Sequence, residues 1–199
     1  LLLLQQALMK VVTGECRRLL ISFPPQHGKS LYTSHWFPVW LLGNFPKTRL
    51  ILTSYEQEVA ERWGRQVRDT LIEHQGLFGI EVSQKSKSAK RWSTTAGGYM
   101  VSVGMGGAIT GRSADIAIID DPVKGAEEVA SPTTREKHKE WFASTLSTRV
   151  QKGGAIILIM TRWHEDDLAG HVLQLEKQGG PKWERVVLPA VAIDPNEVP

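Results

Sequence analysis

The chain has 199 residues, of which 41% are hydrophobic, so it can bury a core of ordinary size and we expect one main domain. Lys and Arg total 24 against 21 acidic residues, and this net charge of +3 suits a polyanionic partner without demonstrating one. The single cysteine, Cys16, excludes an internal disulfide and a multi-cysteine metal site, as is typical of a reducing compartment. The longest apolar run, residues 155–160, is too short to span a bilayer.

The amino terminus consists of four leucines without a methionine, which suggests an excerpt from a longer protein. No basic segment precedes the leucines, and Gln5 and Gln6 interrupt them, so we do not expect a signal peptide. An N-terminal helix that packs on the core is the expected structure.

A strand predicted over about 18–23 leads into a loop that resembles a phosphate-binding loop, Pro24-Pro25-Gln26-His27-Gly28-Lys29-Ser30. A helix predicted from 28 to 42 would direct its free N–H groups and positive dipole end at a polyphosphate. Lys29 would then contact the β- and γ-phosphates, and the Ser30 hydroxyl would ligate Mg²⁺. The match is degenerate, because Phe23 stands where the first glycine is usual. A surface turn is the structural alternative.

The next segments alternate between helix and strand. Pro38 should kink the helix over 28–42, and Gly43-Asn44 should end it. After an apolar run at 50–53, Ser54 is expected to cap a helix together with Gln57. Apolar residues then recur at helical spacing, which predicts an amphipathic surface helix; they are Ala60, Trp63, Val67 and Leu71.

Residues 83–98 are polar and basic, and Trp92 follows a cluster of cations made of Lys85, Lys87, Lys90 and Arg91. A basic cluster beside an aromatic residue can contact nucleic-acid backbone. A solvated loop or hairpin explains the same residues equally well. A strand is predicted at 99–103, and a glycine-rich connection follows it and ends at Arg112.

Two adjacent carboxylates, Asp120 and Asp121, close an apolar strand predicted over 115–119. One strand-end acid can hold the hydration shell of Mg²⁺, and its neighbour can orient or deprotonate an attacking water. Adjacent residues on a strand point to opposite faces, so one of the two acids is alternatively a solvated side chain.

Ser131-Pro132 predicts the start of a helix over 132–149, in which Trp141 and Phe142 are expected to be core residues. Gly153-Gly154 should end that segment before the strand at 155–160, whose tip carries Thr161 and Arg162. Alternating strands and helices predict a parallel sheet, which binds ligands beyond the carboxyl ends of its strands. Phe23, Asp120 and Thr161 all lie at such ends.

His164 and His171 flank a run of acids, but they are not four residues apart as a His-Glu-x-x-His metal site requires. A charged helix N-terminus explains this segment. A further strand is expected within 183–193, followed by a polar end that looks like a truncation point or interdomain linker.

Three ordered motifs together resemble the ATPase domain of the tailed-phage terminase large subunit. They are residues 24–30, the Asp120-Asp121-Pro122-Val123-Lys124 segment with Glu127-Glu128, and residues 161–168. The resemblance implies an α/β P-loop NTPase fold of the ASCE or RecA-like type, with a mostly parallel sheet flanked by helices. It also implies an ATPase domain over 1–190, and a linker beginning at 191–199 toward a nuclease domain outside this sequence.

The resemblance assigns site residues as follows. Pro25, Gln26, His27, Gly28, Lys29 and Ser30 would bind ATP, with Ser30 and Asp120 associated with Mg²⁺. Asp121 takes the place of the usual catalytic glutamate, and Glu127 or Glu128 is the alternative. Thr161 with Arg162 matches the motif that couples hydrolysis to movement. Arg112 resembles an arginine that enters a neighbouring subunit's site, although a loop arginine without contact to phosphate is equally consistent with the sequence. Gln26 stands where relatives often have arginine.

The resemblance implies a motor that uses ATP and Mg²⁺ to move double-stranded DNA into a procapsid. Its expected partners are duplex DNA, other copies of the chain in a ring, a portal protein and a small terminase subunit, in the host-cell cytoplasm. Nuclease activity is not expected from these residues. A helicase-like or DNA-repair ATPase, and a nucleic-acid-binding module with a decayed ATP site, are the alternatives.

Overall fold

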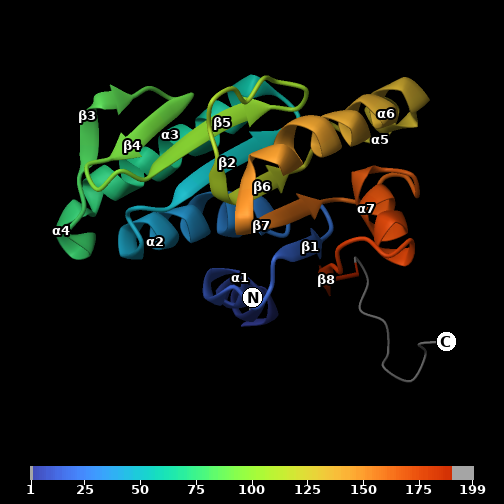
Figure 1. Cartoon of the computed structure of the whole chain (residues 1–199), viewed down its shortest axis with the longest axis horizontal. Coiled ribbons are helices and arrows are strands. Elements are labelled where there is room, and N and C mark those ends of the chain that lie inside the picture. Colours follow the sequence, from blue (N-terminus) through green and yellow to red (C-terminus); the bar gives the residue numbers. More distant parts are fainter. Residues whose placement is uncertain (1, 190–199) are drawn as a thin grey trace.

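A computed structural model describes residues 2–189, except the side chain of Lys87. The described residues form an eight-stranded sheet in the order β3-β4-β5-β2-β6-β7-β1-β8, with helices against both faces (Figure 1). The strands are β1 (Arg18–Ser22), β2 (Arg49–Ser54), β3 (Val82–Lys87), β4 (Arg91–Thr94), β5 (Tyr99–Gly104), β6 (Ala114–Asp120), β7 (Val150–Met160) and β8 (Glu184–Val187). From β5 to β8 in this order all neighbours are parallel, and β3 and β4 add an antiparallel edge. The predicted mostly parallel sheet is confirmed.

The helices are α1 (Leu2–Thr13), α2 (Phe37–Asn44), α3 (Gln57–Glu73), α4 (Gln75–Phe78), α5 (Ala126–Ala130), α6 (Pro132–Trp141) and α7 (Leu168–Lys177). The buried residues divide into two clusters because successive side chains of a strand point to opposite faces of the sheet. In β1, Leu19 and Ile21 pack with α1, α2 and α3, whereas Leu20 packs with α6 and α7. Both faces are covered, which explains why the central strands are continuous apolar runs.

The helix after the loop at residues 23–28 starts at Lys29 and changes its hydrogen-bonding pattern over Leu31–Trp36, where it is π-helical, before it continues as α2. Pro38 lies in the first turn of α2, and the π-helical segment lies directly before it; the kink at this proline stays a prediction. The helix ends at Asn44 as predicted, but Gly43 is not a left-handed cap. It is buried against Phe78, whose ring a Cβ at this position would meet at 2.4 Å.

Two local predictions are wrong. Ser54 is the last residue of β2 and is buried, and Glu56 precedes α3 in its place, so the predicted Ser54 cap is absent. Gly153-Gly154 does not separate a helix from a strand, because β7 already starts at Val150. The register between β6 and β7 shifts there, and the positive φ of 87° at Gly153 fits a bulge.

Other predictions are confirmed. The N-terminal helix forms, residues 132–149 are helical in three successive segments, and Trp141 and Phe142 are buried. Trp92 is also fully buried, so it is a core residue and not a stacking platform. The last predicted strand is β8, and the linker expected over 191–199 lies outside the described residues. Among the described helices, none is long and apolar enough to cross a bilayer.

Candidate nucleotide-binding site

The parallel register brings the ends of several strands to one edge of the sheet. Ser22 of β1 lies beside Met160 of β7, and Asp120 of β6 lies between Ser54 of β2 and Ile159 of β7. Residues that follow these strands therefore converge at this edge, where open parallel sheets bind ligands. The predicted convergence of Phe23, Asp120 and Thr161 is confirmed by a hydrogen bond of 3.3 Å from Thr161 Oγ1 to the carbonyl of Phe23.

The loop between β1 and the helix is exposed from Pro25 to Gly28. Gln26 and Gly28 have positive φ angles of 62° and 72°, which Gly28 adopts without strain and Gln26 does not. His27 Nδ1 lies 2.7 Å from the Pro25 carbonyl and donates to it. The chain thus turns sharply into the helix, whose first N–H groups have no acceptor within the helix.

Lys29 is 7% exposed, and its Nζ lies 2.8 Å from Asp121 Oδ2. Asp121 has a φ of 43°, so the chain leaves the strand direction after Asp120 and the second carboxylate turns toward the loop. This explains how two adjacent acids both reach the site. The other Asp121 oxygen, Oδ1, accepts a hydrogen bond of 3.0 Å from the backbone N–H of Thr161. Asp121 therefore joins the lysine of the loop to the tip of β7.

Asp120 is 2% exposed and accepts a hydrogen bond of 2.7 Å from Ser30 Oγ. Burial raises the pKa of Asp120 to about 6, and the charge of Asp121 adds to this effect, while Ser30, Ser34 and Lys29 oppose it. A hydroxyl and a buried carboxylate in contact offer the hard oxygen atoms that Mg²⁺ prefers. Ser34 is fully buried on the same helix, and its hydroxyl has no hydrogen-bond partner among the described residues. The donor set fits a magnesium ion.

Arg162 points away from the loop and toward the start of α7. Its Nε donates to Asp167 Oδ2 at 2.7 Å, and its Nη2 contacts the carbonyl of Glu165 at 3.2 Å. Asp167 is 1% exposed and also caps α7, since its other oxygen accepts from the N–H of Gly170. The charged helix N-terminus predicted here is confirmed. Arg162, which directly follows Thr161, contacts this N-terminus through Asp167.

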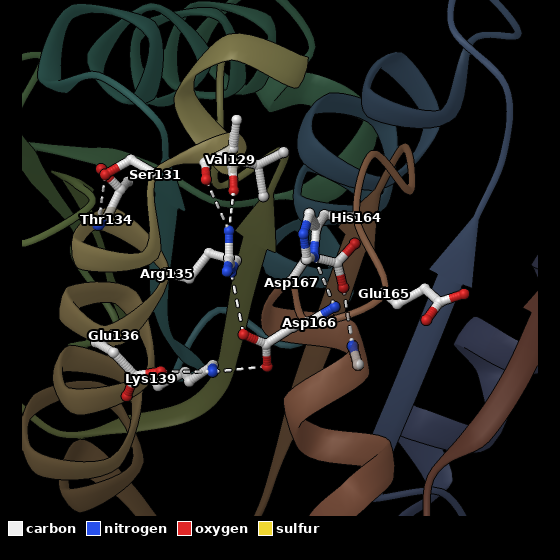
Figure 2. A network of polar contacts seen from close by, with 12 residues as sticks. Val129, Ser131, Thr134, Arg135, Glu136, Lys139, His164, Glu165, Asp166 and Asp167 are labelled. Carbon is white, nitrogen blue, oxygen red and sulfur yellow. Dashed lines mark hydrogen bonds and ion pairs between the residues drawn. The ribbon is translucent and has the colours of Figure 1, made fainter.

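A second ion-pair cluster holds the same segment against α6 (Figure 2). Asp166 accepts from Arg135 Nε at 3.0 Å and from Lys139 Nζ at 2.7 Å. Arg135 also donates to the carbonyl of Val129 at 2.7 Å, near the end of α5. Residues 161–167 are therefore anchored at one end to Asp121 and at the other to α6. His164 Nδ1 accepts from the N–H of Asp166, which makes it part of this turn.

Three sequence-predicted residues, Glu127, Glu128 and Arg112, do not reach the site within this chain. Glu128 accepts a hydrogen bond of 2.6 Å from the N–H of Lys124, and Glu127 is exposed in the same short helix. Arg112 precedes β6 and lies over the ring of Tyr99, 5.6 Å from its centre, at the amino-terminal edge of the sheet. It is separated from Asp120 by the length of β6.

The sequence reasoning missed Ser34, Asp167 and the partners of Asp166. Ser34 was identifiable as the residue one helical turn after Ser30, on the same face of the helix. The pairing of Asp166 with Arg135 and Lys139 carries no local sequence signal, because it depends on how α6 lies beside the segment after β7.

Solved structures with the same fold are large terminases of phages. The HK97 bacteriophage large terminase matches with a TM-score of 0.58 and 15% identity, over 94% of this chain and 39% of that chain. The large terminase of a thermophilic bacteriophage, in complex with ATP-gamma-S, matches with a TM-score of 0.57 and 14% identity, over 92% and 44% of the two chains. The Thermus phage P74-26 large terminase ATPase domain matches with a TM-score of 0.51 and 16% identity, over 77% and 63%.

The chain spans less than two thirds of the length of each of these proteins. At these identities the likeness establishes the fold alone. No curated protein sequence gives a significant match. The family model for the N-terminal part of the terminase large subunit, T4-like virus type, matches residues 20–195, and the chain therefore belongs to the terminase large subunit family.

Proposed function

We propose that this domain binds ATP with Mg²⁺ and hydrolyses it by in-line attack of water on the γ-phosphate. The observation that carries the proposal is the set of four contacting side chains at the end of β6. Lys29 is paired with Asp121, and Ser30 is bonded to Asp120, so a lysine, a hydroxyl and two carboxylates meet beside an exposed loop. Such a site performs little covalent chemistry and acts by positioning and charge stabilisation.

The Lys29–Asp121 pair has a direct role in this mechanism. A polyphosphate in the loop competes with Asp121 for the Lys29 ammonium, and Asp121 is 30% exposed in its side chain, so water reaches it. Once Lys29 turns to the phosphates, the freed carboxylate orients and polarises the attacking water. The Thr161 N–H holds Asp121 Oδ1 in place during this exchange. Ser30 and Asp120 would hold Mg²⁺, which supplies charge neutralisation at the phosphates.

The hydrolysis is coupled to movement through residues 161–167. Asp121 changes its contacts when the γ-phosphate is lost, and the Thr161 N–H donates a hydrogen bond directly to Asp121. Arg162, Asp166 and Asp167 fix the following turn to α7 and α6, so a shift at Thr161 displaces both helices. This assigns Thr161 and Arg162 the coupling role that the family resemblance implies, by way of contacts within the chain.

The substrate moved by the motor is double-stranded DNA, and the chain acts in a homo-oligomeric ring with a portal protein and a small terminase subunit in the host cytoplasm. These partners rest on membership of the family. Arg112 serves the neighbouring subunit. Its place at the edge opposite Asp120 removes it from its own site, and its guanidinium is half-buried against Tyr99 without an ion pair among the described residues. An arginine supplied in this way contributes about 10³ to 10⁵ in rate.

The test is phosphate release from ATP at several protein concentrations, with and without duplex DNA. The native chain should require Mg²⁺ and increase its turnover per chain with concentration, because Arg112 acts after assembly. Lys29→Ala should abolish release, whereas Lys47→Ala, an exposed lysine at the other edge of the sheet, should not. Equal release by the native chain and Lys29→Ala would refute the proposal.

A further inference from the structure

One part of the molecule carries cations without acids. No Asp or Glu lies between Glu81 and Asp115, whereas Lys85, Lys90 and Arg91 all fall in this stretch. The stretch forms β3, β4 and β5, at the edge of the sheet farthest from β8 (Figure 1). The mild positive charge of the whole chain is therefore concentrated on this hairpin.

The turn between β3 and β4 lies near the carboxyl ends of the parallel strands, which is also where the nucleotide site lies. Arg91 pairs with Val101 of β5, and the carbonyl of Lys90 accepts a hydrogen bond of 2.9 Å from the N–H of Ser102. Ser102 is two residues before Gly104, where β5 ends beside β2. Since β4 is three strand spacings from β6, the turn is roughly 15 Å from Asp120 across the sheet.

The turn is fixed to α3 by packing that its polar sequence does not suggest. Trp92 Nε1 donates to the carbonyl of Gly64 at 2.9 Å, and the Trp92 side chain is fully buried. Gly64 is so close to the turn that a Cβ there would lie 2.9 Å from the carbonyl oxygen of Ala89. The exposed Arg65 follows Gly64 in α3. The turn that carries these cations is therefore packed against α3, unlike a solvated loop.

The cations of the turn are also unpaired. Lys85, Lys90 and Arg91 are exposed, and none of the three forms an ion pair among the described residues. Lysine on an edge strand discourages pairing with another sheet, which would explain Lys85 on β3. It does not explain Arg91, because β4 has partners on both sides, or Lys90, which lies in the turn before β4. Protection of a sheet edge therefore does not account for these two charges.

We propose that Lys85, Lys90 and Arg91 bind the phosphate backbone of duplex DNA beside the nucleotide site. The proposal rests on the DNA-moving function proposed above and assigns it a surface. Binding of single strands relies on aromatic platforms, and Trp92 is buried away from this face. Cations without an aromatic platform can bind the phosphate backbone of a duplex independently of its sequence, and a motor must bind DNA at every position along it.

The test compares Lys90→Gln/Arg91→Gln with Lys47→Gln/Lys152→Gln, both in the full chain. The control removes the same charge from two exposed lysines that precede β2 or lie early in β7, at the opposite edge. Fluorescence anisotropy with a labelled duplex, without nucleotide, measures affinity from low to moderate salt. Thermal unfolding checks that each protein is folded.

The Lys90/Arg91 variant should bind the duplex at least about tenfold more weakly at 0.1 M salt, with a salt dependence reduced by about 1.8 in slope for two lost contacts. The control should keep the slope of the native chain. Equal slopes in all three proteins, equal losses in both variants, or no duplex binding by the native chain would overturn the proposal. Phosphate release without DNA is measured on the same samples. If the native chain releases no phosphate, the proposed ATPase activity is refuted. The anisotropy measurement then still shows whether Lys90 and Arg91 bind duplex DNA.

Discussion

Replacing Asp120 with Asn should stabilise the metal-free protein at neutral pH, although it removes a residue assigned to Mg²⁺. Asp120 is 2% exposed, and burial raises its pKa from 3.8 to about 6. Between these two pH values the folded chain holds a proton that the unfolded chain has released. The free energy of unfolding therefore falls as pH rises from about 4 to 6, and the full cost of ionising Asp120 is present above pH 6.

The magnitude follows from the size of the shift. Each pKa unit corresponds to 1.36 kcal/mol, so a shift of about two units amounts to at most about 3 kcal/mol. Asn keeps an oxygen that accepts from Ser30 Oγ but cannot ionise. Asp120→Asn should thus raise the free energy of unfolding at pH 7.5 by about 1 to 3 kcal/mol, and the gain should fall to about a third of that value at pH 4.5, where the unfolded carboxyl is still largely ionised.

Urea unfolding followed by tryptophan fluorescence in EDTA measures both values. Asp121→Asn is the matched control, because it leaves the buried ammonium of Lys29 without its partner. It should destabilise the protein by about 2 kcal/mol at pH 7.5. An Asp120→Asn protein that is less stable than the native chain at pH 7.5, or whose free energy of unfolding changes equally at both pH values, would show that ionisation of Asp120 carries no cost in the folded chain.

Two further predictions concern the coupling segment and the subunit boundary. Asp167→Ala should lower the free energy of unfolding by about 2 kcal/mol, because it removes the cap of α7 and leaves Arg162 unpaired; Asp69→Ala, at an exposed pair, should cost under about 1 kcal/mol in the same urea titration. Arg112→Ala and Lys29→Ala should each lack phosphate release alone, yet a mixture should regain part of it, since a native Arg112 then meets a native Lys29 across a boundary. A mixture that stays inactive under conditions where the native chain assembles would contradict a role in trans.

The strands and their polar ends could be predicted because this sheet is buried on both faces. The apolar runs ending at Phe23, Asp120 and Thr161 identify parallel strands, and such strands place their ends at a common edge. The start of β7 could not be predicted, since the strand continues through Gly153 by a bulge that depends on its pairing with β6.

The candidate site could be predicted by residue type but not by orientation. The positive φ at Asp121 turns its carboxylate to Lys29, and no sequence rule anticipates this for a residue that directly follows a strand. The direction of the Arg162 side chain could not be predicted either, because the position of its partner Asp167 depends on the turn between β7 and α7. Arg112 could be identified as an arginine after a glycine-rich loop, whereas its place at the opposite edge required the direction of β6.

The loop at Gly28, Lys29 and Ser30 is the proposed site for ATP with Mg²⁺. Calorimetric titration with a slowly hydrolysed ATP analogue tests it directly, because binding by one chain does not require assembly. We expect saturable binding of one nucleotide per chain that depends on Mg²⁺ and is lost in Lys29→Ala, with binding by Lys47→Ala unchanged. Absence of binding by the folded native chain, or equal binding by Lys29→Ala, would contradict the account.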